Sequence, residues 1–102
     1  MEGIRIEVGE TLSGSLEESG DRKLYNFVVA TEDTYVMFTT SNFDPMLYLY
    51  DVNMVQIQSN DDSGGNLQPL IIRNLAIGNY YLEVAGWGLS YGDYQLTLDY
   101  ED

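Results

Sequence analysis

Apolar and polar residues alternate along most of this chain in short runs. In the run 24–30, for example, Tyr25, Phe27 and Val29 fall on one face. A period of two, with many β-branched and aromatic residues, is typical of half-buried β-strands. The positions that the alternation places together on strand faces, where core or rim packing is expected, are Ile4, Ile6, Val8, Tyr25, Phe27, Val29, Val36, Phe38, Leu47, Leu49, Tyr80, Leu82, Val84, Tyr94, Leu96, Leu98 and Tyr100.

Turn-forming residues separate these runs, for example at 19–21, 42–45 and 86–92. Short strands punctuated in this way are typical of a sandwich or a barrel, and no stretch has the length and period of a helix. We find no linker and no internal repeat. The pattern therefore predicts a single all-β domain over residues 1–102, with about eight strands.

The charge balance excludes some classes of binding partner. The chain has 102 residues, of which 17 are acidic and four are basic, for a net charge of −13. Such a charge repels phosphate backbones, so we expect no nucleic acid partner, and it disfavours anionic membrane surfaces. No stretch approaches the roughly 20 apolar residues of a membrane-spanning helix, and the first residues lack a signal-peptide core. As given, the chain would stay where it is made.

The residue types that most enzymes rely on are missing. The sequence has no histidine and no cysteine, which rules out a Ser-His-Asp triad, a Cys-His pair and a disulfide. Asp61 and Asp62 are the closest approach to a carboxylate pair. Adjacent side chains in an extended chain point to opposite sides, whereas glycoside hydrolysis needs two carboxyl groups about 5–9 Å apart across a cleft. We therefore expect a protein that is not an enzyme.

A candidate metal site lies in the segment SNDDSGG, residues 59–65. Calcium takes six to eight oxygen ligands, and this loop supplies carboxylate, amide and hydroxyl oxygens. Asp44 and Asp51 bracket the preceding strand and would join the loop if the hairpin folds back. The alternative is a turn in which Asn60 and Asp61 bond their own backbone. The candidate calcium ligands are Asp44, Asn60, Asp61 and Asp62.

Aromatic residues are the second candidate feature, with nine tyrosines and one tryptophan. Trp87 and Tyr91 lie in a glycine-rich loop, where they either stack against a ligand or pack into the core. Tyr48 and Tyr50 alternate with Leu47 and Leu49, so both faces of that strand are apolar. Either the strand is covered on both sides, or its tyrosine face binds a partner.

Three segments, in order, carry a resemblance to a known family. They are GETLSGSLEESGDRKLYNFVV (9–29), FDPMLYLYDVNMVQIQSNDDSGG (43–65) and LAIGNYYLEVAGWGLSYGDYQLTL (75–98). Together they resemble the bacterial pre-peptidase C-terminal domain, with its Tyr-x-Phe strand, its acidic loop and its Gly-x-Tyr-x-Leu strand. The resemblance covers nearly the whole chain.

The resemblance implies an antiparallel β-sandwich of jelly-roll type, related to the collagen-binding domains of bacterial collagenases. Those domains are non-catalytic, and collagenase-type domains hold collagen with tyrosines on a sheet face. The collagenase branch also binds calcium, through an acidic N-terminal linker and an Asp-rich turn. In this chain Leu24 stands where an aspartate is common before the Tyr-x-Phe strand, although Asp21 is present. We therefore do not expect the calcium site of the collagenase branch in this chain.

We expect a monomeric accessory domain of a larger secreted or cell-surface protein, with a protein or polysaccharide surface as partner and calcium as a candidate stabilising ion. The candidate contact residues are Tyr48, Tyr50, Trp87 and Tyr91. Two alternatives stay open: a carbohydrate-binding module that uses the exposed Trp and Tyr rings, and a structural spacer without a ligand.

Overall fold

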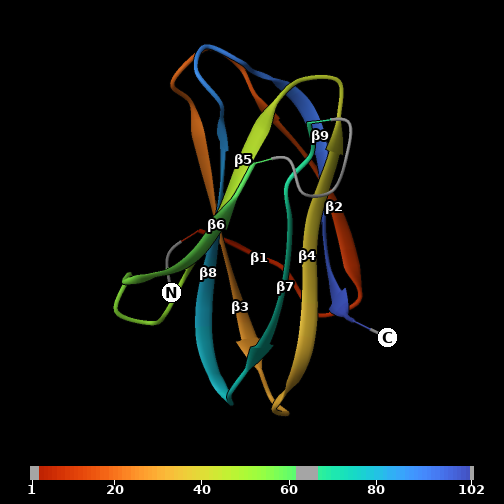
Figure 1. Cartoon of the computed structure of the whole chain (residues 1–102), viewed down its shortest axis with the longest axis vertical. Coiled ribbons are helices and arrows are strands. Elements are labelled where there is room, and N and C mark those ends of the chain that lie inside the picture. The colour runs from red at the N-terminus through yellow and green to blue at the C-terminus, as the bar shows by residue number, and fades with distance from the viewer. Residues whose placement is uncertain (1–2, 62–66, 102) are drawn as a thin grey trace.

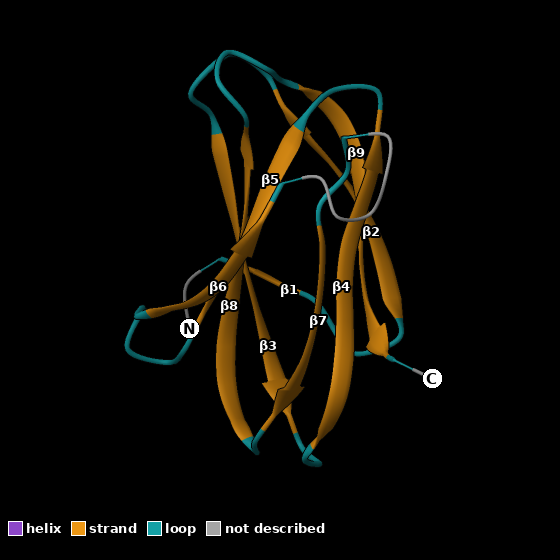
Figure 2. Cartoon of the chain, viewed as in Figure 1, coloured by secondary structure: helices purple, strands orange, loops and turns teal. Residues whose placement is uncertain are grey.

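The computed structural model describes residues 3–61 and 67–101, which form nine strands and no helix (Figures 1 and 2). The strands are β1 (Ile4–Arg5), β2 (Glu10–Leu16), β3 (Arg22–Val29), β4 (Asp33–Ser41), β5 (Pro45–Tyr50), β6 (Gln56–Asn60), β7 (Leu70–Leu75), β8 (Gly78–Gly86) and β9 (Gly92–Tyr100). The predicted all-β class is confirmed. Within the described ranges there is consequently no helix long and apolar enough to cross a membrane.

Two sheets face each other and make a sandwich (Figure 1). Sheet A has the order β1-β3-β8-β5-β6, and sheet B has the order β2-β9-β4-β7. From β2 to β5, and again from β6 to β9, each strand is followed by one in the other sheet, which is the winding of a jelly roll. All strand pairs are antiparallel except the short pairing of β1 with β3.

The core lies between the sheets and consists of the inward-facing residues of the longer strands. In β3, β8 and β9 the alternation predicted the inward side correctly, as for Leu96 and Leu98 in β9. The confirmed core positions are Ile6, Tyr25, Phe27, Val29, Leu47, Leu49, Leu82, Val84, Tyr94, Leu96 and Leu98, with Val8 and Tyr80 packed partly buried against them.

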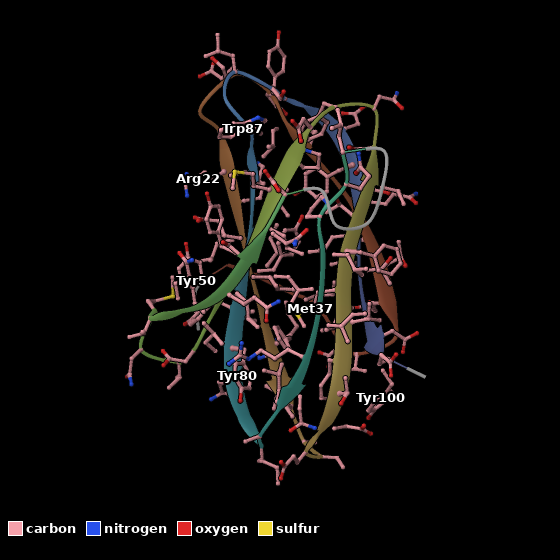
Figure 3. All side chains as sticks on the ribbon, viewed as in Figure 1. Arg22, Met37, Tyr50, Tyr80, Trp87 and Tyr100 are labelled. Atoms are coloured by element: carbon pink, nitrogen blue, oxygen red, sulfur yellow. The ribbon has the colours of Figure 1, made fainter. Side chains whose placement is uncertain are left out.

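Four of the predicted positions lie outside the core. In β4 the fully buried residues are Tyr35 and Met37, while Val36 and Phe38 are only partly buried. Both faces of that strand are apolar, so a period of two cannot tell which one points inward; Met37 lies between the sheets (Figure 3). Ile4 is exposed because β1 is a two-residue edge strand. Tyr100 ends β9, where its ring packs against Tyr35 but stays 45% exposed.

Candidate functional site

The predicted calcium ligands lie at one end of the β5–β6 hairpin. Leu47 pairs with Asn60 in the register, so Asp44, just before β5, and Asp61, just after β6, are at the same end. Asp51 lies at the other end, so the expectation that it joins the loop is wrong. There its carboxylate accepts hydrogen bonds from the N–H groups of Asn53 at 2.9 Å and Val55 at 3.0 Å.

Asn60 and Asp44 also have structural roles. The side-chain oxygen of Asn60 accepts the N–H of Leu70 at 3.1 Å, which ties the edge of sheet A to the edge of sheet B. The carbonyl oxygen of Asp44 accepts the N–H of Trp87 at 2.8 Å. Asp62 falls outside the described residues, and among those that are described no group of three or more acidic side chains is arranged to hold a metal ion. Calcium binding at this loop stays a prediction.

The predicted contact residues Tyr48 and Tyr50 lie on the outer face of sheet A, which no other layer of the sandwich covers. Their rings are stacked, with centroids 6.4 Å apart and planes at 24°. In the register of the sheet, Tyr48 lies opposite Glu83 and Tyr50 lies opposite Tyr81 on β8. The strand is therefore central, with its leucines in the core and its tyrosines half-buried on the outside.

Two charged residues that no sequence pattern singles out hold these rings in place. Arg22 of β3 donates to the Oε1 atom of Glu83 at 2.8 Å, and its guanidinium carbon lies 5.5 Å from the centre of the Tyr48 ring. The hydroxyl of Tyr50 donates to the same carboxylate oxygen at 2.9 Å. We call Arg22, Tyr48, Tyr50 and Glu83 the tyrosine face; Arg22 and Tyr50 point away from sheet B (Figure 3).

The electrostatics of the tyrosine face favour the neutral form of Tyr50. Burial, the hydrogen bond to Glu83 and the negative charge of Glu83 raise the pKa of Tyr50 to about 12, against the opposing effect of Arg22. The hydrogen bond to Glu83 is also the main cause that raises the pKa of Arg22. Near neutral pH one carboxylate therefore accepts hydrogen bonds from both a guanidinium and a phenol.

Trp87 and Tyr91 lie in the loop between β8 and β9 and are 56% and 53% exposed, which rules out the core alternative for both rings. Leu89, between them, is the third exposed apolar side chain of this loop. The backbone is fixed by the hydrogen bond from Trp87 to Asp44 and by one from the N–H of Ser90 to the carbonyl of Trp87 at 3.1 Å. Gly86 is required there, because a Cβ atom would lie 1.8 Å from the oxygen of Ser90.

The fold and the tyrosine face together define a class of protein. It is a small jelly-roll sandwich in which contacting tyrosine, arginine and glutamate side chains lie on the outer face of one sheet. No protein-family model and no curated protein sequence matches the chain. Among solved structures, it is similar to the pre-peptidase C-terminal domain of a collagenase from Bacillus anthracis, with a TM-score of 0.81 and 22% identity over 96% of this chain and 95% of that one. This confirms the fold that the sequence resemblance predicts.

The chain is also similar to two inhibitors of g-type lysozyme. PliG from Aeromonas hydrophila, a periplasmic inhibitor of g-type lysozyme, has a TM-score of 0.71 and 16% identity over 94% of this chain and 95% of that one. PliG from Salmonella Typhimurium, with the same description, has a TM-score of 0.58 and 21% identity over 95% and 98% of the two chains. At these identities the likeness shows a shared fold alone.

Proposed function

We propose that this chain is a non-catalytic accessory domain that binds another protein through the tyrosine face, in a protein exported to the periplasm or beyond. The observation that carries this proposal is the cluster of Arg22, Tyr48 and Tyr50 around Glu83. Tyrosine and arginine are enriched among the residues that dominate binding energy in protein interfaces.

The contacts within the cluster support a binding role because they order the side chains before any partner arrives. Immobilising a flexible side chain on binding costs about 0.5–1.5 kcal/mol. Arg22 is held by a carboxylate and a ring face, and Tyr50 by the same carboxylate, so part of that cost is already met in the free protein. The known neighbours with this fold include a domain of a collagenase and inhibitors of a lysozyme, both of which point to protein partners.

The experiment measures binding of the purified chain to fibrillar collagen by cosedimentation and to g-type lysozyme by surface plasmon resonance. We expect one of them to bind, and the double variant Tyr48→Ala/Tyr50→Ala to weaken binding at least about tenfold. Tyr100→Ala is the matched control, since Tyr100 is an exposed tyrosine at the end of sheet B. Undiminished binding by the double variant, or equal loss in the control, refutes the tyrosine face as the contact surface.

The structural spacer and the carbohydrate-binding module, the two alternatives to a protein-binding domain, predict different results. A structural spacer binds neither protein, and neither does it respond to the tyrosine substitutions except through folding. A carbohydrate-binding module that uses the exposed loop rings loses glycan binding when Trp87 is replaced by alanine. Assays with protease and glycosidase substrates test the non-catalytic part, and turnover that survives repurification would overturn it.

A further inference from the structure

The outer face of sheet B contains a shallow, wide-open hollow of about 720 Å³ at the level of Gly14. Three strands border it: β2, β9 and the end of β4 with the residue that follows. Its lining consists of Ser13, Gly14, Ser15, Thr40, Ser41, Asn42, Asp93, Tyr94 and Gln95. Because alternate residues of a strand share a face, five of these residues turn their side chains outward: Ser13, Ser15, Thr40, Asp93 and Gln95. Asn42, in the bend just after β4, is exposed and is the sixth.

The floor of the hollow is closely packed. Gly14 lies opposite Tyr94 in the β2–β9 register, and beneath it the hydroxyl groups of Tyr25 and Tyr94 are hydrogen-bonded at 2.6 Å. A Cβ atom on Gly14 would lie 2.6 Å from the Tyr94 oxygen and 2.8 Å from the Tyr25 oxygen. The strand therefore rests directly on a buried polar pair and has no room to move inward.

The outward side chains form an array of unused hydrogen-bonding groups. Within the part of the chain that the structure describes, none of the six bonds to another protein group, whereas Thr11 and Thr97, on the same face, bond to each other at 2.8 Å. Ser13, Gln95 and Thr40 form one row across the three strands. Neighbouring strands are about 4.8 Å apart, so the row is about 10 Å wide.

We propose that this hollow binds a neutral oligosaccharide that lies across β2, β9 and β4. Hydroxyl, amide and carboxylate groups can each donate to or accept from sugar hydroxyls, and Asp93, an acceptor with two oxygens, can take two of them at once. A carboxylate in the hollow and a net charge of −13 disfavour phosphorylated or acidic ligands. The lining offers no aliphatic pocket for the side chains of a peptide.

Sugar binding here is independent of the protein-binding role proposed above, because the two surfaces lie on opposite sheets. A ¹⁵N-labelled sample is titrated with oligosaccharides of glucose, mannose, galactose and N-acetylglucosamine, and with oligogalacturonate as the anionic control. We expect at least one neutral sugar to shift the amide resonances of residues 13–15, 40–42 and 93–95 in a saturable way. Oligogalacturonate is expected to leave them unchanged.

The matched variants are Asp93→Ala and Asp99→Ala, measured by isothermal titration calorimetry. Both residues face outward from β9, but Asp99 lies six positions further along, outside the hollow. Asp93→Ala removes a charged hydrogen-bond acceptor from the hollow and is expected to weaken the affinity for the sugar at least about tenfold. The affinity of Asp99→Ala is expected to stay within about twofold of that of the unmodified protein. Gln95→Ala is a second variant within the hollow, and it is expected to weaken binding less than Asp93→Ala does.

Three results would overturn sugar binding at the hollow. The first is the absence of saturable binding by all four neutral sugars. The second is a set of shifts confined to the tyrosine face or to residues 87–91. The third is an equal loss of affinity in the Asp93 and Asp99 variants. The Tyr48→Ala/Tyr50→Ala variant should bind the sugar normally, which separates failure here from failure of the protein-binding role.

Discussion

Replacing Tyr94 with phenylalanine is expected to leave the hydroxyl of Tyr25 buried without a hydrogen-bond partner. Tyr25 is 1% exposed, and its hydroxyl bonds to that of Tyr94 at 2.6 Å. An unsatisfied buried polar group costs about 1–3 kcal/mol, whereas removing both partners together can be nearly neutral. The single variants Tyr25→Phe and Tyr94→Phe should therefore each lose about 1–3 kcal/mol, and the double variant about 1 kcal/mol or less.

Urea unfolding of the four proteins in this double-mutant cycle measures the effect, with thermal unfolding as a second probe. A loss of 1 kcal/mol lowers the midpoint by about 4–8 °C in a domain of this size, so each single variant should melt about 4–24 °C lower. The control is Tyr80→Phe, since the Tyr80 hydroxyl donates to the carbonyl of Ala76 at an exposed site. There water can replace the lost partner, and we expect a change within about 0.5 kcal/mol.

Additive losses would refute this reasoning. If the double variant loses the sum of the two single losses, the hydroxyl groups act independently and the buried pair is not a unit. Equal slopes of free energy against urea concentration are needed for the comparison, because a changed slope indicates a change in the unfolded or the folded state rather than in the bond.

Three further predictions concern Gly14, Tyr50 and the candidate calcium site. Gly14→Ala should lower stability by about 1–3 kcal/mol through overpacking, and less in the Tyr25→Phe/Tyr94→Phe background, which urea unfolding checks. Because the pKa of Tyr50 in the folded protein is raised to about 12, the neutral phenol contributes to folding stability fully below pH ~10, and this contribution is lost as the pH rises through 12. Tyr50→Phe should therefore flatten the fall of the thermal midpoint with alkaline pH. An unchanged dependence of the midpoint on pH would contradict this. If calcium binds near Asp61, calcium at 100 times its dissociation constant should raise the midpoint by roughly 10 °C, and no shift between millimolar calcium and chelator would end the calcium prediction.

The candidate contact residues were only partly predictable. Tyr48 and Tyr50 stood out because both faces of their strand are apolar, and Trp87 and Tyr91 because they sit among glycines. Arg22 and Glu83 carried no such signal. They are 61 residues apart, and each looks like an ordinary solvated charge until β3 and β5 are placed on either side of β8.

The residues of the polar hollow also could not be brought together from the sequence alone. Ser13, Gly14 and Ser15 belong to the first segment that carries the family resemblance, but only the pairing with β9 shows that Gly14 lies over Tyr25 and Tyr94. Alternation along the chain predicts that Asp93 and Gln95 share one face of their strand, but nothing local places Ser13 of β2 and Thr40 of β4 beside them.

By itself, the sequence determined the all-β class, the inward residues of β3, β8 and most of β9, the acidic surface and the missing histidine and cysteine. These depend on composition and on a period of two, which are local properties of the chain. The tertiary structure alone decided the inward side of β4, the grouping of Arg22 and Glu83 with Tyr48 and Tyr50, and the hollow around Gly14. The physical reason is that strand order and register join residues far apart in the chain, and no local pattern encodes which strands become neighbours.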